Sequence, residues 1–296
     1  MLLAEEHAAL GSQPVQVKAI DAADVQRVAE FLHVHLNARV TQDAWARAME
    51  ASWGVDKPNS GFMLLHGDSV VGAHLAFYSE REIGGVPERI CNLGAWCVLP
   101  EHRFHGLRLL RALLAQEGYS FTDLSPSGSV IPLNARLGFD RLDTTTRLVP
   151  NLPWPGRPGR PLISADPELL ARTLTGPDLR LYRDHAQTGA ARHLVLIRDG
   201  EWCYVIFRKD RRKGLPLFAS ILYVSDPGLL REMARPLARY LIRHGALVTL
   251  AEERIVGYWP PPSLRLRSGR PRMFRSARLE AAQVDYLYSE LVCVPW

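Results

Sequence analysis

Apolar and polar positions at the start of the chain predict one strand followed by two helices. Residues 15–19 alternate as a short strand does. Asp21 is a suitable N-cap for a helix that ends near Asn37, because its carboxylate can accept a backbone N–H of the first turn. Thr41 is placed to cap a second helix through Trp53 in the same way.

Two largely apolar runs, Gly61–His66 and Ser69–Ser79, then predict a hairpin that turns at Gly67 and Asp68. Glu88–Leu99 predicts the next strand. Helices and strands alternate after it: helix 104–117, strand 120–125, helix 129–137 and strand 141–149. The predicted order is β-α-α-β-β-β-α-β-α-β, which places the fold in the α/β (α+β) class.

A stretch rich in proline and glycine separates two halves of the chain. Residues 149–161 contain five prolines and two glycines, which is typical of a semi-rigid linker. We therefore predict a first domain over 1–150, a linker over 151–161 and a second domain over 162–296.

The second half repeats the pattern of the first. The repeated elements are a hairpin (193–197 and 202–209), a strand (216–224), a helix (227–244) and a further strand (246–250). An unrelated α/β domain with the same order by coincidence is the alternative. The C-terminal residues 284–294 alternate loosely and predict closing strands.

Composition is that of a globular protein. The 296 residues are 47% hydrophobic and 23% charged, and the length is sufficient for two domains. The chain has no run of about 18 apolar residues. Its first residues are acidic rather than basic, so we expect no secretory signal, no membrane segment and a cytoplasmic location.

Four cysteines are present, and none forms a Cys-x-x-Cys pair, so we expect no structural zinc. Cys91 and Cys97 are an even number of residues apart on one predicted strand, and we expect them to share a face as reduced thiols.

The net charge of +5 and the isoelectric point of about 9.2 give only a modest basic excess. Nucleic-acid binding rests on that excess alone, so we do not expect it. The densest basic run, residues 208–213, is typical of a solvated hairpin turn. An anionic ligand would also favour nearby positive charge.

The junction after strand 88–99 carries the most specific chemistry. The strand ends at Pro100, a short polar loop follows, and Gly106 opens a helix. Unpaired N–H groups and the helix dipole at such an N-terminus suit a pyrophosphate, and glycine lets a phosphate approach the backbone. Arg103 and Arg108 add positive charge. An ordinary strand-to-helix turn is the alternative.

Residues 103–108 resemble the Arg/Gln-x-x-Gly-x-Gly/Ala signature of the GNAT superfamily of N-acetyltransferases, with Arg108 in place of the last small residue. About 30 residues later, Arg136–Phe139 matches the family's Lys-Leu-Gly-Phe sequence, as the family's spacing requires. The resemblance implies two tandem GNAT-like domains, each a mixed, mostly antiparallel twisted sheet flanked by helices. Asp226 at the second junction would repel phosphate, so we expect the second copy to be degenerate and to lack the cofactor site.

The resemblance implies acetyl-CoA, or another acyl-CoA, as co-substrate and no metal. The backbone of Trp96, Cys97 and Val98 would pair with the pantetheine arm and polarise the thioester carbonyl. The Trp96 side chain is equally well explained as a core residue. The residues expected to hold the pyrophosphate are Arg103, Phe104, His105, Gly106, Leu107 and Arg108.

Three residues are our catalytic candidates. Asn134 stands where the family has its tyrosine acid, and its amide can hydrogen-bond the sulfur without donating a proton usefully. Asp123 lies in an apolar strand, so it faces the cleft or has a partner. Ser125 caps the following helix or contacts substrate. In the strand before the loop, Asn92 is the central polar side chain, and Glu88 at its entrance is a base acting through water or an exposed strand-end acid.

We therefore expect an acyltransferase that moves an acetyl or other acyl group from acyl-CoA to an amine by direct transfer in a ternary complex. The amine would belong to a small molecule or a peptide. The protein would be a monomer, as an internal pseudo-dimer, or a homodimer. A non-catalytic acyl-CoA-binding or protein-interaction module on the same scaffold is the alternative, because the usual tyrosine is missing.

Overall fold

A computed structural model describes residues 14–153, 155, 161–266 and 269–296 of the protein, which form two compact units. The first unit comprises the described residues up to Leu124 with Arg275–Arg278 and Tyr288–Glu290. The second comprises Ser125–Phe274, Leu279–Leu287 and Leu291–Trp296. Segments from the end of the chain therefore belong to the first unit.

This division by packing falls at a different place from the domain boundary predicted at 151–161. Most of that predicted linker, residues 154 and 156–160, lies outside the described residues. The linker and the domain limits 1–150 and 162–296 stay predictions.

The first unit has the predicted order of elements. They are β1 (Gln16–Ala19), the 3-10 turn η1 (Ala22–Asp24), α2 (Val25–His35), α3 (Gln42–Glu50), β2 (Gly61–His66), β3 (Ser69–Ile83), β4 (Val86–Val98), η2 (Pro100–His105), α4 (Gly106–Leu114) and β5 (Ser120–Asp123). Asp21 and Thr41 cap their helices as expected, accepting the N–H groups of Ala23 and Ala44.

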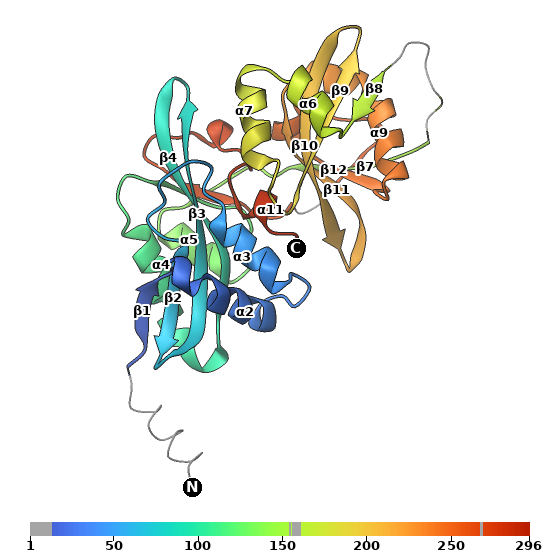
Figure 1. Ribbon diagram of the computed structural model, residues 1–296. Helices are drawn as coiled ribbons and strands as arrows, with labels where there is room; N and C mark the ends of the chain where they lie inside the picture. Colours follow the sequence, from blue (N-terminus) through green and yellow to red (C-terminus); the bar gives the residue numbers. More distant parts are fainter. Residues whose placement is uncertain (1–13, 154, 156–160, 267–268) are drawn as a thin grey trace. The chain divides into compact units, whose positions relative to one another are not determined.

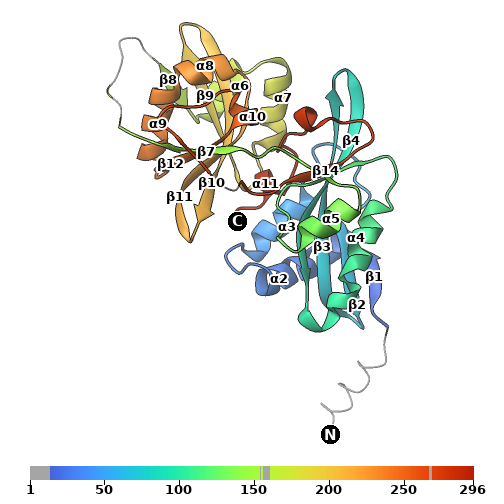
Figure 2. The ribbon, with the colours of Figure 1, turned by 180° about the vertical axis from the view of Figure 1, so that it is seen from behind.

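Strands β1 to β4 are antiparallel neighbours, and β5 lies parallel to β4. Helices α2 and α3 lie on one side of this sheet and α4 on the other, as the front and rear views show (Figures 1 and 2). The helix α4 makes the crossover that a parallel β4–β5 pair needs.

A β-bulge interrupts β4 at Ala95. Leu75 pairs with Gly94 but the adjacent His74 pairs with Trp96, so Ala95 is the extra residue, with a positive φ of 34°. The bulge reverses which face the later side chains occupy. Cys91 and Cys97 pair with Tyr78 and Ala73, which are an odd number of residues apart on β3. The prediction that the two cysteines share a face is therefore wrong, although all four thiols are free.

The chain from residue 125 onward contains the remaining elements. They are α5 (Val130–Arg136), β6 (Asp140–Arg141), β7 (Thr146–Pro150), β8 (Leu162–Ser164), α6 (Pro167–Thr173), α7 (Gly176–His185), β9 (Ala191–Arg198), β10 (Glu201–Arg212), β11 (Leu215–Val224), α8 (Pro227–Glu232), α9 (Ala234–Arg243), β12 (Val248–Glu252), α10 (Glu253–Val256), β13 (Leu264–Arg265), β14 (Met273–Arg275), η3 (Ala281–Gln283) and α11 (Glu290–Cys293).

The sheet of the second unit has the order β13-β7-β12-β11-β10-β9-β8. All its pairs are antiparallel except β11 with β12. Helices α8 and α9 connect that parallel pair and pack Leu230, Leu237 and Leu241 onto one face of the sheet. The connection β11–helix–β12 matches β4–α4–β5 of the first unit, as the repeated pattern predicted.

Three sequence predictions for this part need correction. The strand predicted over 141–149 is interrupted, because the Asp143 carboxylate accepts the Thr145 N–H and turns the chain between β6 and β7. The helix predicted over 227–244 divides at Met233 into α8 and α9. Residues 284–294 contain the short helix α11 rather than strands, and Tyr288 has a left-handed φ of 55° that an extended strand does not tolerate.

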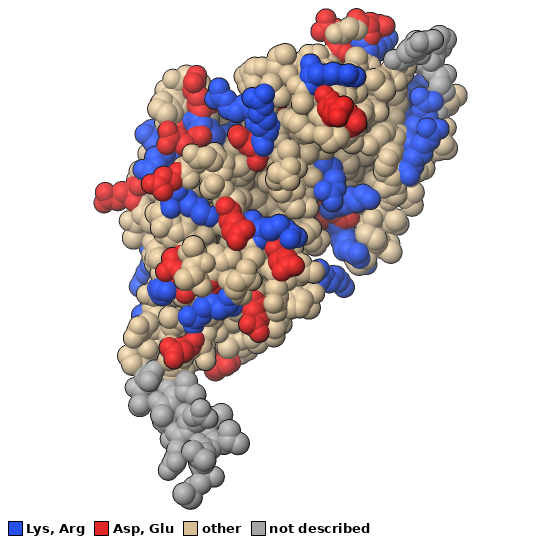
Figure 3. Space-filling model, viewed as in Figure 1, with Lys and Arg blue, Asp and Glu red and all other residues tan. Residues whose placement is uncertain are grey.

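Acidic and basic side chains are interspersed over the face of the molecule seen in Figure 3. Among the described residues, every helix is too short or too polar to span a lipid bilayer.

The start of β2 provides a test of the first sheet. Gly61 has a φ of 114°, and a Cβ atom there would lie 2.2 Å from the backbone oxygen of His74. We expect Gly61→Ala to lower the free energy of unfolding by about 3 kcal/mol in urea titrations followed by circular dichroism. Gly85→Ala is the control: its φ of 80° is also left-handed, but no atom lies within 4 Å, so it should cost about 1 kcal/mol. Equal losses would contradict the close approach of β2 and β3.

Candidate active site

The candidate site of the first unit lies where β4 and β5 separate. Their parallel pairing runs from Ile90 with Ser120 to Leu93 with Asp123 and then ends. Strand β4 continues to Val98 paired with β3 alone. Among the described strands, none adjoins the other edge of β4 beyond Leu93, so its backbone groups there are placed to pair with an extended ligand.

Glu290 lies against the start of this separation. Its carboxylate Oε2 accepts the N–H of Ala95, the bulge residue, at 3.0 Å. Its own backbone N–H donates to Oδ1 of Asn92 at 2.9 Å. Asn92 in turn donates from Nδ2 to Oγ1 of Thr122 on β5 at 3.0 Å. The carboxylate is thus held between the last paired residues of β4 and β5 and the bulge.

Gly94 makes room for this carboxylate. A Cβ atom at Gly94 would lie 2.7 Å from Oε2 of Glu290 and 2.9 Å from the ring of Phe77. Glu290 therefore fills the space that a side chain of β4 would otherwise occupy. Because Glu290 is 0% exposed, its charge depends on hydrogen bonds such as that from Ala95.

Tyr288 fixes the approach of the C-terminal segment to the first unit. Its ring packs edge-on against Trp53, with centroids 5.3 Å apart, and the guanidinium carbon of Arg81 lies 4.9 Å from the ring centroid. Ser289, next in the chain, is buried. These contacts leave Glu290 little freedom to move away from β4.

Sequence reasoning missed Glu290. The available signal was an acid within the apolar C-terminal run 284–294, which favours burial with a partner over a closing strand. Nothing local indicates that the partner is Ala95, 195 residues earlier.

The predicted pyrophosphate loop has the expected path. The 3-10 turn η2 covers Pro100–His105, and α4 begins at Gly106. The Gly106 N–H donates to the carbonyl of Arg103, so this amide already has a partner. A Cβ atom at Gly106 would lie 3.4 Å from Val98, which is ordinary contact. Packing alone thus does not require glycine there.

The side chains of the loop differ in whether they have hydrogen-bond partners within the protein. Arg108 donates from Nη1 to the carbonyl of Val15 at 2.7 Å and lies 3.3 Å from Nδ1 of His105. Arg103 and Arg108 are both exposed, as is Phe104, which is 95% accessible. Leu107 is half-buried. Arg103 is therefore the better placed of the two arginines for an incoming anion, while Arg108 attaches the loop to the first strand.

Trp96 and Cys97 are explained by packing. The Trp96 ring stacks on His74 at 4.7 Å, with an angle of 3° between the planes, and it packs against the cluster that contains Leu109. Its side chain belongs to the core, which leaves its backbone for any ligand contact. Burial raises the pKa of the half-buried Cys97 thiol, which disfavours a nucleophilic thiolate.

The three predicted catalytic residues are not brought together in one unit. Asp123 is buried at the end of β5 in the first unit. Ser125 is exposed and Asn134 on α5 is wholly buried, and both belong to the second unit. Asp123 is the residue of β5 at which its pairing with β4 ends, and the catalytic roles of all three residues stay predictions.

Glu88 differs from both sequence expectations. It is 2% exposed, and its Oε1 lies 3.0 Å from Nε of Arg278 in the same unit. The interpretation of an exposed strand-end acid is wrong. The ion pair gives Glu88 a structural partner in the C-terminal segment.

The corresponding junction of the second unit is occupied by a protein carboxylate. Asp226 Oδ1 accepts the N–H of Leu229 at 3.0 Å and caps α8. Its negative charge stands at the start of the helix and would repel a phosphate there, and the degenerate second copy stays a prediction. Within the described part of the chain, no group of three or more His, Cys, Asp or Glu side chains is arranged to hold a metal ion.

Comparison with known proteins identifies the fold. No protein-family model matches the chain, and no curated protein matches its sequence. Solved structures do match. A GCN5-related N-acetyltransferase from Anabaena variabilis has a TM-score of 0.57 at 11% identity, over 88% of this chain and 72% of that one.

Two further structures extend the likeness. A putative acetyltransferase from Pyrococcus horikoshii has a TM-score of 0.55 at 13% identity, over 92% of this chain and 93% of that one. A probable N-acyltransferase from Enterococcus faecalis has a TM-score of 0.57 at 14% identity, over 91% of this chain and 74% of that one. The protein therefore has the fold of GCN5-related N-acetyltransferases, which confirms the predicted fold class.

The buried His74, which stacks on Trp96, should make the stability of the first unit depend on pH. Burial lowers the His74 pKa from 6.5 to about 3, and its Nδ1 has no hydrogen-bond partner among the described residues. The unfolded chain binds this proton more readily, so the free energy of unfolding should fall by about 3 kcal/mol between pH 6.5 and pH 4 from this residue. In His74→Gln, the free energy of unfolding should fall by about 3 kcal/mol less over that pH range than it does in the wild type. An unchanged slope would mean that His74 is accessible to protons in the folded state.

Proposed function

We propose that the protein transfers an acyl group from acyl-CoA to an amine. The observation that carries the proposal is the separation of β4 from β5 at Leu93 and Asp123, directly before the bulge at Ala95, with α4 opening beyond the end of β4. An extended pantetheine arm would pair with the open strand edge. Its pyrophosphate would lie at the start of α4, near Arg103 and the amides of Leu107 and Arg108. The fold of the acetyltransferases above supports this assignment.

Backbone groups of Trp96, Cys97 and Val98 would orient the thioester. In acyl transfer, the carbonyl oxygen gains negative charge as the amine attacks, and fixed N–H donors stabilise that charge. A strand edge held by β3 on its other side supplies such donors without reorganisation. This role needs backbone geometry rather than particular side chains, in agreement with the packing of Trp96 into the core.

Glu290 is the proton acceptor in this proposal. Its carboxylate is buried beside the strand separation and is held by the Ala95 amide, so it is oriented and shielded from bulk water. The amine, deprotonated by Glu290, would attack the carbonyl carbon. The C–S bond would then break, and the CoA thiolate would take up the second proton, which the nitrogen loses as the amide forms. Thiolate is a tolerable leaving group, so this route needs no tyrosine at the position of Asn134.

A non-catalytic protein-interaction module on the same scaffold is the second candidate, and two contacts favour it. The Gly106 amide already donates to Arg103, and Arg108 is attached to Val15. Both would limit the donors available to a pyrophosphate. The amine acceptor, which we expect on a small molecule or a peptide, the cytoplasmic location and the choice between a monomer and a homodimer stay predictions.

Gly106→Asp tests the cofactor site. The new carboxylate would stand at the start of α4 and repel the phosphates, so we expect acetyl-CoA affinity to fall at least about 100-fold in calorimetric titration. Gly85→Asp is the matched control, because it adds the same charge to a turn of the first unit with no atom within 4 Å of the new Cβ. The wild type should bind one equivalent per chain. Equal affinity of the wild type and Gly106→Asp would contradict the site, and no binding of any CoA species by the wild type would contradict the function.

Glu290→Gln tests the proton acceptor. The amide oxygen can still accept from Ala95, so we expect the fold and the acetyl-CoA affinity to be kept while kcat falls about 100-fold or more. Turnover is followed by thiol release with a panel of amines. Glu117→Gln, an exposed site in the same unit, is the control. The acid limb of the pH–rate profile should also disappear in Glu290→Gln. A full kcat with an unchanged pH profile would exclude Glu290 as the base.

A further inference from the structure

A cavity of about 690 Å³ in the second unit lies outside the proposed acyl-transfer site. Three segments line it: the turn between β6 and β7 around Thr144, the strand β13 with Arg265, and the residues that lead into β14, including Arg272. Its volume is in the range of small-molecule sites.

The cavity has an excess of positive charge. Arg141, Arg265 and Arg272 line it, against the single carboxylate of Asp143. That carboxylate accepts hydrogen bonds from the hydroxyl and the N–H of Thr145 at 2.7 and 2.9 Å, and these bonds lower its pKa. The Asp143 carboxylate thus stabilises the turn. The three guanidinium groups leave the lining with a net positive charge.

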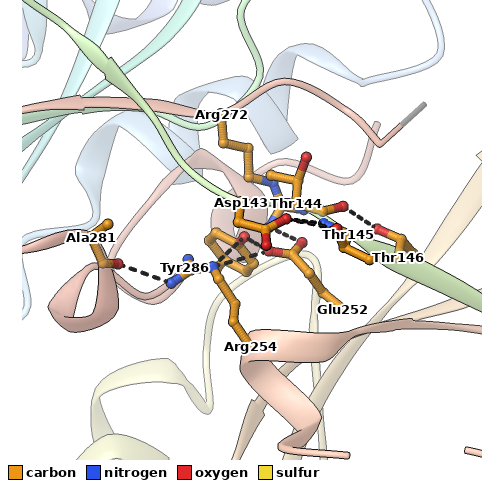
Figure 4. Close-up of polar contacts among 9 residues, drawn as sticks. All are labelled: Asp143, Thr144, Thr145, Thr146, Glu252, Arg254, Arg272, Ala281 and Tyr286. Carbon is orange, nitrogen blue, oxygen red and sulfur yellow. Dashed lines mark hydrogen bonds and ion pairs between the residues drawn. The ribbon is translucent and has the colours of Figure 1, made fainter. Parts of the chain in front are cut away.

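Arg272 is the least exposed arginine of this cluster. Its Nη1 lies 3.1 Å from Oε2 of Glu252, and its guanidinium carbon lies 3.5 Å from the centroid of the Tyr286 ring. Glu252 is shared, because its Oε1 also accepts from Arg254 Nε at 3.1 Å and from the Tyr286 hydroxyl (Figure 4). Burial raises the Tyr286 pKa to about 12, so the phenol stays neutral. One carboxylate therefore serves two guanidinium groups.

Arg272 has donor capacity left over. Its Nε is buried and has no hydrogen-bond partner among the described residues. Arg272 also lines a smaller cavity with Arg212, Arg270 and the carboxylates of Asp210 and Glu252, and Asp210 is paired to Arg270 at 3.2 Å. Burial and the neighbouring guanidinium groups of Arg270 and Arg272 lower the Arg212 pKa. An anion near Arg272 would relieve this repulsion.

The backbone at Gly269 lies close to the backbone of Thr144 on the opposite side of the cavity. A Cβ atom at Gly269 would lie 2.4 Å from the carbonyl oxygen of Thr144, so only glycine permits this approach. The contact holds the segment of Arg272 against the turn that carries Thr144 and Thr145. The arginines and the threonines are thereby brought to one cavity. Figure 4 shows Arg272 of this lining with Asp143, Thr144 and Thr145 of the turn.

We propose that this cavity binds a phosphorylated small molecule. The forked donors of Arg141, Arg265 and Arg272 suit a phosphate dianion, and the Thr144 hydroxyl adds a neutral donor. The remaining volume accommodates the organic part of a phosphomonoester. This site is independent of acyl transfer, since it uses no residue of the β4–α4 junction.

Calorimetric titration of the full chain with sodium phosphate, at ionic strength held constant with sodium chloride, tests the proposal. Saturable binding of one equivalent is expected. Arg141→Gln and Arg265→Gln, both at exposed positions, should each weaken it about tenfold or more. Arg243→Gln removes the same charge from an exposed position of α9 and should change nothing. Equal weakening by Arg243→Gln, or no saturable heat at millimolar phosphate, would overturn the site.

Two further titrations locate and classify the ligand. Phosphate binding must persist in Gly106→Asp, because its loss there would assign the anion to α4 and overturn the proposal. Adenosine monophosphate and inorganic phosphate are then compared on the wild type. Tighter binding of the nucleotide that is lost in Arg265→Gln supports an organic phosphomonoester as the ligand, whereas tighter binding of inorganic phosphate with the same loss supports free phosphate in the same cavity.

Discussion

The hydrogen bond from the Ala95 amide to the buried Glu290 carboxylate is the constraint on which the candidate site depends. A charge at 0% exposure is stable only where the protein replaces water as its donor. The bulge turns an amide toward Glu290, Gly94 leaves space for the carboxylate, and Asn92 holds its backbone. The same bulge stands where β4 loses β5 as a neighbour, so one local irregularity both opens the strand edge and places an acid beside it.

Sequence patterns predicted the local features of the fold well. The caps at Asp21 and Thr41, the hairpin at Gly67 and the start of α4 at Gly106 each depend on a few neighbouring residues. The bulge at Ala95 does not, because it is a property of the register between β3 and β4. Because of this extra residue, the prediction that Cys91 and Cys97 share a face of the sheet is wrong. Glu290 was also missed because its hydrogen-bond partner is not a sequence neighbour. The packing of segments 195 residues apart brings Ala95 and Glu290 together.

The two units share the same strand–helix–strand connection but have different residues at the start of the helix. Both have a parallel strand pair joined by a helical crossover, yet the second caps that helix with Asp226 where the first opens it with Gly106. The second unit instead concentrates arginines around Glu252 and Tyr286. Likeness of fold to acetyltransferases thus extends along most of the chain, while the CoA site that we propose uses residues of the first unit alone.

The sequence position of Glu290 also sets the order in which the site forms during synthesis. Ribosomes make strands β1 to β5 early, but Glu290 follows the second unit's whole sheet. A nascent chain that has emerged only as far as β5 therefore exposes the bulge amide to water with no carboxylate to accept from it. If Glu290 acts as proposed, catalysis begins only in chains that have been translated past this residue, and a ribosome that stalls in the second half yields an inert product.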